Sequence, residues 1–242
     1  MMSLSGRRVR AVFTKEVREF RRNRSITAGM AIIPLVFSVQ PLISIFALQP
    51  AASAPLAQEH VLLYMLGIPA LVPSLIAAYS VVGERQQGTL EPVLTTPIRA
   101  DELLLGKALA TFLPAVAIAY AVYGLFLLAV ELFAADGVAS ALIRPSDLIA
   151  QLLFTPLLAG WSIWLAIVIS TRSSDVRVAQ QFATLASLPT VALTTLIALN
   201  VIPPSPRLAV TAAVVLILLN VLGWKTAAKA FDREILITNT RS

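Results

Sequence analysis

Residues capable of acid–base or metal chemistry are few in this sequence. Charged residues make up 13% of the 242 positions, His60 is the single histidine, and cysteine is absent. One histidine without any cysteine argues against a zinc site, and the lack of cysteine excludes disulfides. The sequence also lacks the Gly-x-x-x-x-Gly-Lys-Ser/Thr loop that binds nucleotide phosphates. We therefore expect this chain to have no enzyme activity and to bind no cofactor or metal itself.

The stretch 83–107 is the longest charged and turn-rich interruption between apolar segments. Gly88 permits a tight turn because a residue without Cβ tolerates positive φ. Thr89 then occupies the position of a helix N-cap, and Glu91 lies near the positive end of the helix dipole. The pattern predicts a short helix beside a membrane with one polar face, which suits docking to a soluble partner.

Three parts of the chain carry motifs that recur together in a known family. These motifs are Glu84-Arg85, Gly88-Thr89-Leu90-Glu91, Thr96-Pro97-Ile98, Glu102-Leu103-Leu104-Leu105-Gly106-Lys107, Thr171-Arg172-Ser173-Ser174 with Arg177-Val178-Ala179-Gln180-Gln181, and Phe231-Asp232-Arg233-Glu234. In this order they resemble ABC type-2 transporter permeases, the membrane subunits of ATP-binding-cassette exporters. The sequence departs from the family at Arg99, where a serine is common, and at Pro92.

The resemblance implies partners for this chain. A separate ABC ATPase subunit would hold the ATP and Mg, and a second permease copy, identical or related, would complete the transporter. The residues implied as the ATPase contact, with the two leucines as anchors of the coupling helix, are Glu84, Arg85, Gly88, Thr89, Leu90, Glu91 and Leu94. A second contact on the same side would use Arg172, Asp175 and Arg177.

The composition predicts an all-α, polytopic membrane protein. Hydrophobic residues form 57% of the chain, and several runs reach the roughly 20 residues that a spanning helix needs. The predicted spans are 26–48, 61–82, 108–133, 148–170, 181–202 and 208–224, all within a single domain. A cleavable signal peptide is the alternative for the first run, but that run is longer than such peptides carry.

The flanking regions complete the predicted membrane domain. Residues 1–24 combine apolar positions at helical spacing with eight Lys or Arg, and Glu16 interrupts the apolar stripe. This pattern favours an amphipathic helix on an anionic membrane surface; a disordered basic tail is the alternative. The connection 83–107 contains the coupling helix, which Pro97 ends, and the start of a second helix, which Asp101 and Glu102 open and which runs into the span 108–133. Residues 225–242 form a tail.

Basic residues are distributed very unevenly across the predicted connections. Six spans place 17 of the 19 Lys and Arg on one side of the membrane, and only Arg144 and Arg207 on the other. Positive residues accumulate on the cytoplasmic side, so both termini are predicted to be cytoplasmic in a multi-pass cell-membrane protein. The net charge of +6 is then explained by basic residues on the cytoplasmic side of the membrane, and no nucleic-acid partner is expected.

Uncharged polar and aromatic residues within the spans are the candidates for a substrate path. They are Gln40, Trp161, Trp164, Asn200 and Asn220. Hydrogen bonding and packing between helices is the default interpretation, because such bonds stabilise membrane helices modestly. Trp161 and Trp164 share one face of their span, and an aromatic wall also suits an amphipathic cargo.

These observations favour the permease subunit of an ATP-driven exporter of a hydrophobic or amphipathic compound. The first alternative is an ion-coupled secondary transporter, which the absence of charges from the central parts of the spans argues against. The second is an anchoring subunit without transport, which the coupling-like stretch argues against. A neighbouring ATPase gene would discriminate among the three.

Overall fold

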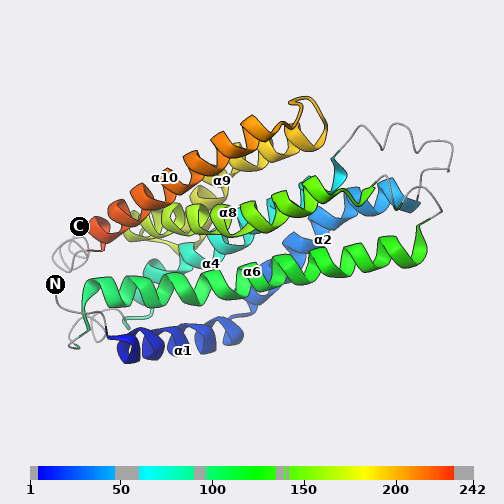
Figure 1. Ribbon diagram of the computed structural model, residues 1–242. Helices are drawn as coiled ribbons and strands as arrows, with labels where there is room; N and C mark the ends of the chain where they lie inside the picture. The colour runs from blue at the N-terminus through cyan, green and yellow to red at the C-terminus, as the bar shows by residue number, and fades with distance from the viewer. Residues whose placement is uncertain are drawn as a thin grey trace.

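The computed structural model describes residues 5–46, 60–89, 96, 98–134, 139 and 142–231. Within these residues the chain forms helices and no strands, so the predicted all-α class is confirmed (Figure 1). The principal elements are α1 (Gly6–Arg22), α2 (Arg24–Phe46), the 3-10 helix η2 (Val61–Leu66), α4 (Gly67–Gln86), α6 (Ala100–Phe133), α8 (Pro145–Arg172), α9 (Val176–Ala198) and α10 (Pro206–Ala230).

Six segments of the described chain are long and apolar enough to cross a membrane. They are α2, η2 joined to α4, α6, α8, α9 and α10, which confirms the six predicted spans. α2 continues through Pro34 and Pro41, and α9 continues through Pro189. Packing against neighbouring helices lets spanning helices accommodate proline.

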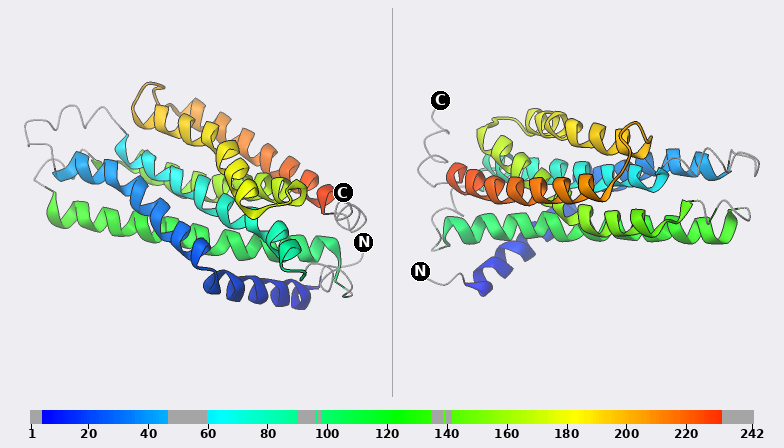
Figure 2. Two further views of the ribbon diagram at one scale, coloured as in Figure 1. Left: turned by 180° about the vertical axis from the view of Figure 1, so that it is seen from behind. Right: turned by 45° about the horizontal axis from the view of Figure 1, so that its top comes forward.

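The ends of the described helices lie at two ends of the bundle (Figure 1). α1, the last turn of α4, the first turn of α6, the 173–175 connection and the last turn of α10 lie at one end, which we call the α1 end. The α9–α10 connection lies toward the opposite end. α1 runs obliquely beside the first turns of α6 (Figure 2).

α4 is the central helix, with 16 of its 20 residues buried. It packs most extensively against α8 and α9, and also contacts α2 and α6. α10 lies at the periphery against α8, and its buried residues are Ala213, Gly223 and Ala227. Large apolar side chains cover the rest of α10, as expected of a helix facing lipid or another apolar surface.

The spanning helices at the α1 end extend beyond the predicted spans. α4 continues to Gln86, and α6 begins at Ala100, so the predicted helix that Asp101 and Glu102 open is confirmed and Lys107 lies inside it. α10 likewise continues to Ala230, beyond the predicted end at Trp224. The predicted coupling helix over residues 90–95 and the tail beyond Phe231 lie outside the described residues.

Candidate functional site

The sequence-predicted coupling stretch begins with a tightly bonded turn at the end of α4. Gly88 has a φ of 67°, its amide donates to the Arg85 carbonyl at 3.1 Å, and the Thr89 amide donates to the Glu84 carbonyl at 2.9 Å. These two bonds form a Schellman motif, in which a left-handed residue closes the helix. Glycine adopts that conformation without strain, so the predicted turn at Gly88 is confirmed.

The last turn of α4 is tied to the connection between α8 and α9. The Arg85 guanidinium donates to the carbonyl oxygens of Ser173 at 3.0 Å and Thr171 at 3.2 Å. The Gln86 amide donates to the Ser174 carbonyl and to the Asp175 carboxylate, both at 3.3 Å. The two stretches that the sequence associated with ATPase contact are therefore joined to each other.

Asp175 is the N-cap of α9. Its carboxylate accepts from the backbone amides of Arg177 at 2.7 Å and Val178 at 3.3 Å. The Val178 and Arg177 amides stabilise the ionised carboxylate, which lowers the pKa of Asp175 below its ordinary value. Arg172 and Arg177 are exposed on either side of this cap.

Three buried ionised side chains meet where α1, α4 and α6 converge. The Lys107 ammonium lies 2.8 Å from a carboxylate oxygen of Glu16 and 2.8 Å from one of Glu84. It also donates to the Ser80 carbonyl at 2.7 Å. None of these three charged side chains is more than 2% exposed. Hydrogen bonds to Glu16 and Ser80 and the ion pair with Glu84 together make burial of this charge tolerable.

Lys15 bridges this charged triad to the surface of α1. Its ammonium pairs with Glu16, Glu19 and Glu84. Partial burial disfavours the charged ammonium, but the Glu16 and Glu84 carboxylates outweigh that effect and raise the pKa of Lys15. We call the group formed by Lys15, Glu16, Glu84 and Lys107 the charge junction.

Close packing and a helix cap hold α1 against α6 beside the charge junction. A Cβ at Gly106 would lie 2.6 Å from Val12, so only glycine permits this approach. The Glu102 carboxylate accepts from the backbone amides of Ser5 at 2.8 Å and Arg99 at 3.1 Å. Glu102 therefore caps its own helix in place of the Arg99 side chain, which gives no cap bond.

A buried hydroxyl connects α8 to α4 one turn inside the charge junction. Ser170 donates to the Ala78 carbonyl at 2.6 Å and accepts from the amides of Val81 and Val82 at 3.2 and 3.1 Å. Because Ser170 is fully buried, this bonding is shielded from water. α1, α4, α6 and α8 are thus linked at the same end of the bundle.

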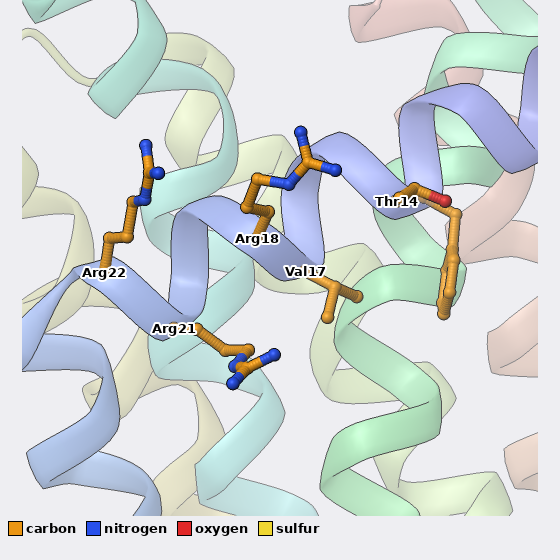
Figure 3. A pocket seen from close by; sticks show the side chains of 6 residues that line it. Thr14, Val17, Arg18, Arg21 and Arg22 are labelled. Atoms are coloured by element: carbon orange, nitrogen blue, oxygen red, sulfur yellow. The ribbon is translucent and has the colours of Figure 1, made fainter.

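The surface of α1 away from the charge junction is rich in arginine. Arg18 and Arg22 project from one side of the helix and Arg21 from the other (Figure 3). Together with Phe13, Thr14 and Val17 they line a hollow of about 460 Å³. The opposite stripe buries Val9, Val12, Glu16 and Phe20. The predicted amphipathic helix is therefore confirmed, and its basic face is available to an anionic surface.

The predicted coupling residues divide into three groups. Glu84 is buried in the charge junction, so its carboxylate lacks the exposed position that direct ATPase contact requires. Arg85, Gly88 and Thr89 shape the end of α4, and the Thr89 hydroxyl donates to the Glu84 carbonyl at 3.3 Å. The remaining residues, Leu90, Glu91 and Leu94, lie outside the described residues.

The path candidates on α8 and α10 have separate environments. Trp164 packs edge-on against Trp224 with ring centroids 5.3 Å apart, and its indole N–H donates to the Asn220 side chain at 3.2 Å. Asn220 also donates to the Leu157 carbonyl at 3.0 Å, so the interhelical interpretation is confirmed for this residue. A Cβ at Gly160 would meet the Asn220 oxygen at 2.2 Å, which explains the close helix approach.

Trp161 lies elsewhere, in an apolar groove between η2, α8, α9 and α10. The groove has a volume of about 330 Å³, and Leu193, Leu208 and Leu216 are among its lining residues. Asn200 is exposed with a φ of 56° on the turn that ends α9, and not within the span where it was predicted. Gln40 belongs to α2, but its side chain lies outside the described part of the chain.

Sequence reasoning missed the charge junction. Lys107 was assigned to a connection, and Glu16 was treated as a defect in the apolar stripe of α1. A carboxylate on the buried stripe of an amphipathic helix requires a cation from another element. The position of Glu16 on the apolar stripe therefore indicated a buried cation, but it did not identify Lys107, which lies 91 residues away in the sequence.

The fold and this site together define a polytopic helical membrane protein in which α1, α4 and α6 meet at the charge junction. The sequence matches the family described as "ABC-2 family transporter protein" over residues 10–237, and the chain belongs to this family. It is thus a membrane permease component of an ABC transporter, a class that partners with an ABC ATPase subunit. A comparison with curated proteins found no match.

Proposed function

We propose that this protein is the permease subunit of an exporter whose separate ATPase docks on the α1 end. In this arrangement the α1 end faces the cytoplasm, the ATPase supplies ATP and Mg, and two permease copies form the transport path. The export of a hydrophobic or amphipathic compound is supported by the apolar groove beside Trp161 and by the family to which the chain belongs.

The observation that carries the proposal is the bonding around the end of α4. Gly88 fixes the direction in which the chain leaves α4, Arg85 holds the α8–α9 connection, and Glu84 holds α1 and α6 through Lys15 and Lys107. A displacement of the 87–99 connection would therefore reach α1, α4, α6 and α8 together. This is the property that a coupling element needs.

The proposal is tested on the connection itself. Glu91→Arg would place a cation where the partner surface is proposed to be polar or basic, and like charges at an interface can cost several kcal/mol. Gly88→Val would strain the turn because a β-branched residue resists positive φ. Both variants should insert normally but lose co-purified ATPase or transport-dependent ATP turnover.

Arg207→Glu is the matched control, because this exposed charge lies in the first turn of α10, whose last turn lies at the α1 end, and it should affect neither readout. If Glu91→Arg and Gly88→Val both retain wild-type assembly and turnover, the connection is not the coupling element. The orientation is tested separately with single cysteines at Ser140 and Ser173. An impermeant thiol reagent applied to intact cells should label the first and spare the second.

A further inference from the structure

Exposed arginines are concentrated where α1 passes into α2. Arg18, Arg21 and Arg22 lie in the last turns of α1, and Arg24 is the first residue of α2. Among the residues that the structure describes, none of these four arginines forms an ion pair with an acidic side chain. We call this group the arginine corner.

The acidic residues of α1 do not neutralise the arginine corner. Glu16 and Glu19 both pair with Lys15, and Glu16 also pairs with the buried Lys107. Their carboxylates are therefore committed to the lysines of the charge junction. A surface of unpaired guanidinium groups attracts an anion, and phosphate suits it because a guanidinium can donate two parallel hydrogen bonds to phosphate oxygens.

The hollow on this part of α1 combines cationic and apolar surface. Arg18 and Arg22 project from one side of the helix and Arg21 from the other (Figure 3), and Phe13 and Val17 also line the hollow of about 460 Å³. Both apolar side chains pack against the core of the bundle. This combination suits a phosphate that is attached to an apolar molecule better than it suits a free phosphate ion.

The arginine corner lies directly before the first membrane span. α1 ends at Arg22, and the span begins at Ile26. Asn23 and Thr27 hold the corner: the Asn23 side chain accepts from the Ile26 amide, and the Thr27 hydroxyl donates to the Phe20 carbonyl, both at 3.4 Å. Further along α2, large apolar side chains are exposed at the spacing of one helix face, namely Ile32, Leu35, Val36 and Val39. The arginines therefore lie at the depth of lipid phosphates, and these apolar side chains lie at the depth of acyl chains.

We propose that the arginine corner binds the headgroup of an anionic phospholipid, whose phosphate is held by the guanidinium groups of Arg18, Arg21 and Arg22. An acidic protein surface could also bind a basic patch, but the apolar part of the hollow and the adjacent span favour a lipid. General attraction to an anionic membrane needs only positive charge. A bound headgroup also needs the planar, paired donors of arginine.

Replacement of arginine by lysine separates these two possibilities. Native mass spectrometry of the purified full-length protein in a nonionic detergent should show saturable binding of phosphatidylglycerol and weaker binding of phosphatidylcholine. Arg18→Lys combined with Arg22→Lys keeps the charge but should weaken phosphatidylglycerol binding roughly tenfold, because paired hydrogen bonds to the phosphate are lost. Arg7→Lys combined with Arg10→Lys is the matched control, since these exposed arginines lie at the other end of α1, and it should retain wild-type binding.

Three results would overturn the proposal. Equal phosphatidylglycerol binding by wild type and by Arg18→Lys with Arg22→Lys would show attraction by charge alone. Competition by inorganic phosphate at the concentration of the lipid would indicate a site for a free anion. Loss of co-purified ATPase from the same double variant, with lipid binding unchanged, would assign the arginine corner to a protein partner. The lipid assay contains no ATPase, so its failure would leave the proposed function untouched.

Discussion

The two halves of the bundle bury polar side chains in opposite ways. At the α1 end, Lys107 lies 2.8 Å from both Glu16 and Glu84. On α8, Gln151 and Thr155 are just as buried, but their side-chain polar atoms have no hydrogen-bond partner among the described residues. A well-paired buried network favours one arrangement of its elements, whereas uncommitted groups can exchange partners at small cost. We therefore expect the charge junction to move as a unit.

The largest predicted effect comes from removing the cation at the centre of the charge junction. Lys107→Met leaves Glu16 and Glu84 buried with Lys15 as their remaining cation, which should cost about 3–5 kcal/mol of stability. Thermal unfolding of the purified protein, followed by tryptophan fluorescence, measures the loss. Lys225→Met, an exposed lysine of α10 at the same end, should change stability by about 0.5 kcal/mol or less.

Equal stability of Lys107→Met and Lys225→Met would break the contrast between the two halves. A double variant, Lys107→Met with Glu84→Gln, tests the paired half of the bundle further. Neutralising one orphaned carboxylate should recover part of the loss, because residues within one ionic network are coupled and their effects are not additive.

A smaller effect is expected at the close approach of α1 and α6. The added Cβ in Gly106→Ala would lie 2.6 Å from Val12 and 3.2 Å from the Val9 carbonyl, so α1 must shift, at a cost of about 1–3 kcal/mol. Gly124→Ala is the matched control, because no atom lies within 4 Å of its added Cβ. Trypsin should cut α1 of Gly106→Ala faster than that of Gly124→Ala; equal cutting rates would show that α1 is not held there.

The smallest effect concerns the link between α4 and the α8–α9 connection. Asp175→Ala removes the N-cap of α9 and should lower the unfolding temperature slightly, whereas Asp175→Asn retains a capping oxygen without the charge. Because the folded-state pKa of Asp175 is lowered, the contribution of its charge is full above the unfolded-state value of about 3.9 and disappears as pH falls through the lower folded-state value.

Unfolding temperatures at two pH values measure this charge directly. Wild type should exceed Asp175→Asn near neutral pH, and the difference should disappear in strong acid. A difference that is constant across this pH range would exclude the carboxylate charge as the source of the stabilisation.

Features determined by short stretches could be predicted from the sequence. Apolar runs of about 20 residues locate the six spans, and Gly88 alone indicates the left-handed turn after α4. The amphipathic pattern of α1 is also local. Each of these depends on the periodicity or backbone freedom of a few neighbouring residues, so one sequence is enough.

Features that depend on pairing between distant segments could not be predicted in the same way. Hydropathy assigned Lys107 to a connection because it scores the charge without its partners, and those partners come from α1 and α4. Glu84 appeared to belong to an exposed surface for the same reason. The prediction that Asn200 lies within the fifth span was wrong. The turn that ends α9 depends on backbone conformation, which cannot be read from the composition of the segment.

The charge junction also has a consequence for how the protein is made. Glu16 leaves the ribosome 91 residues before Lys107, and Glu84 follows long after α1 is complete. Until α4 and α6 have both been inserted, α1 has no buried cation to receive its carboxylate and would be held at the membrane surface by its arginines. Docking of α1 is therefore a late step in biogenesis, and it reports that the second and third spans have met in the correct register.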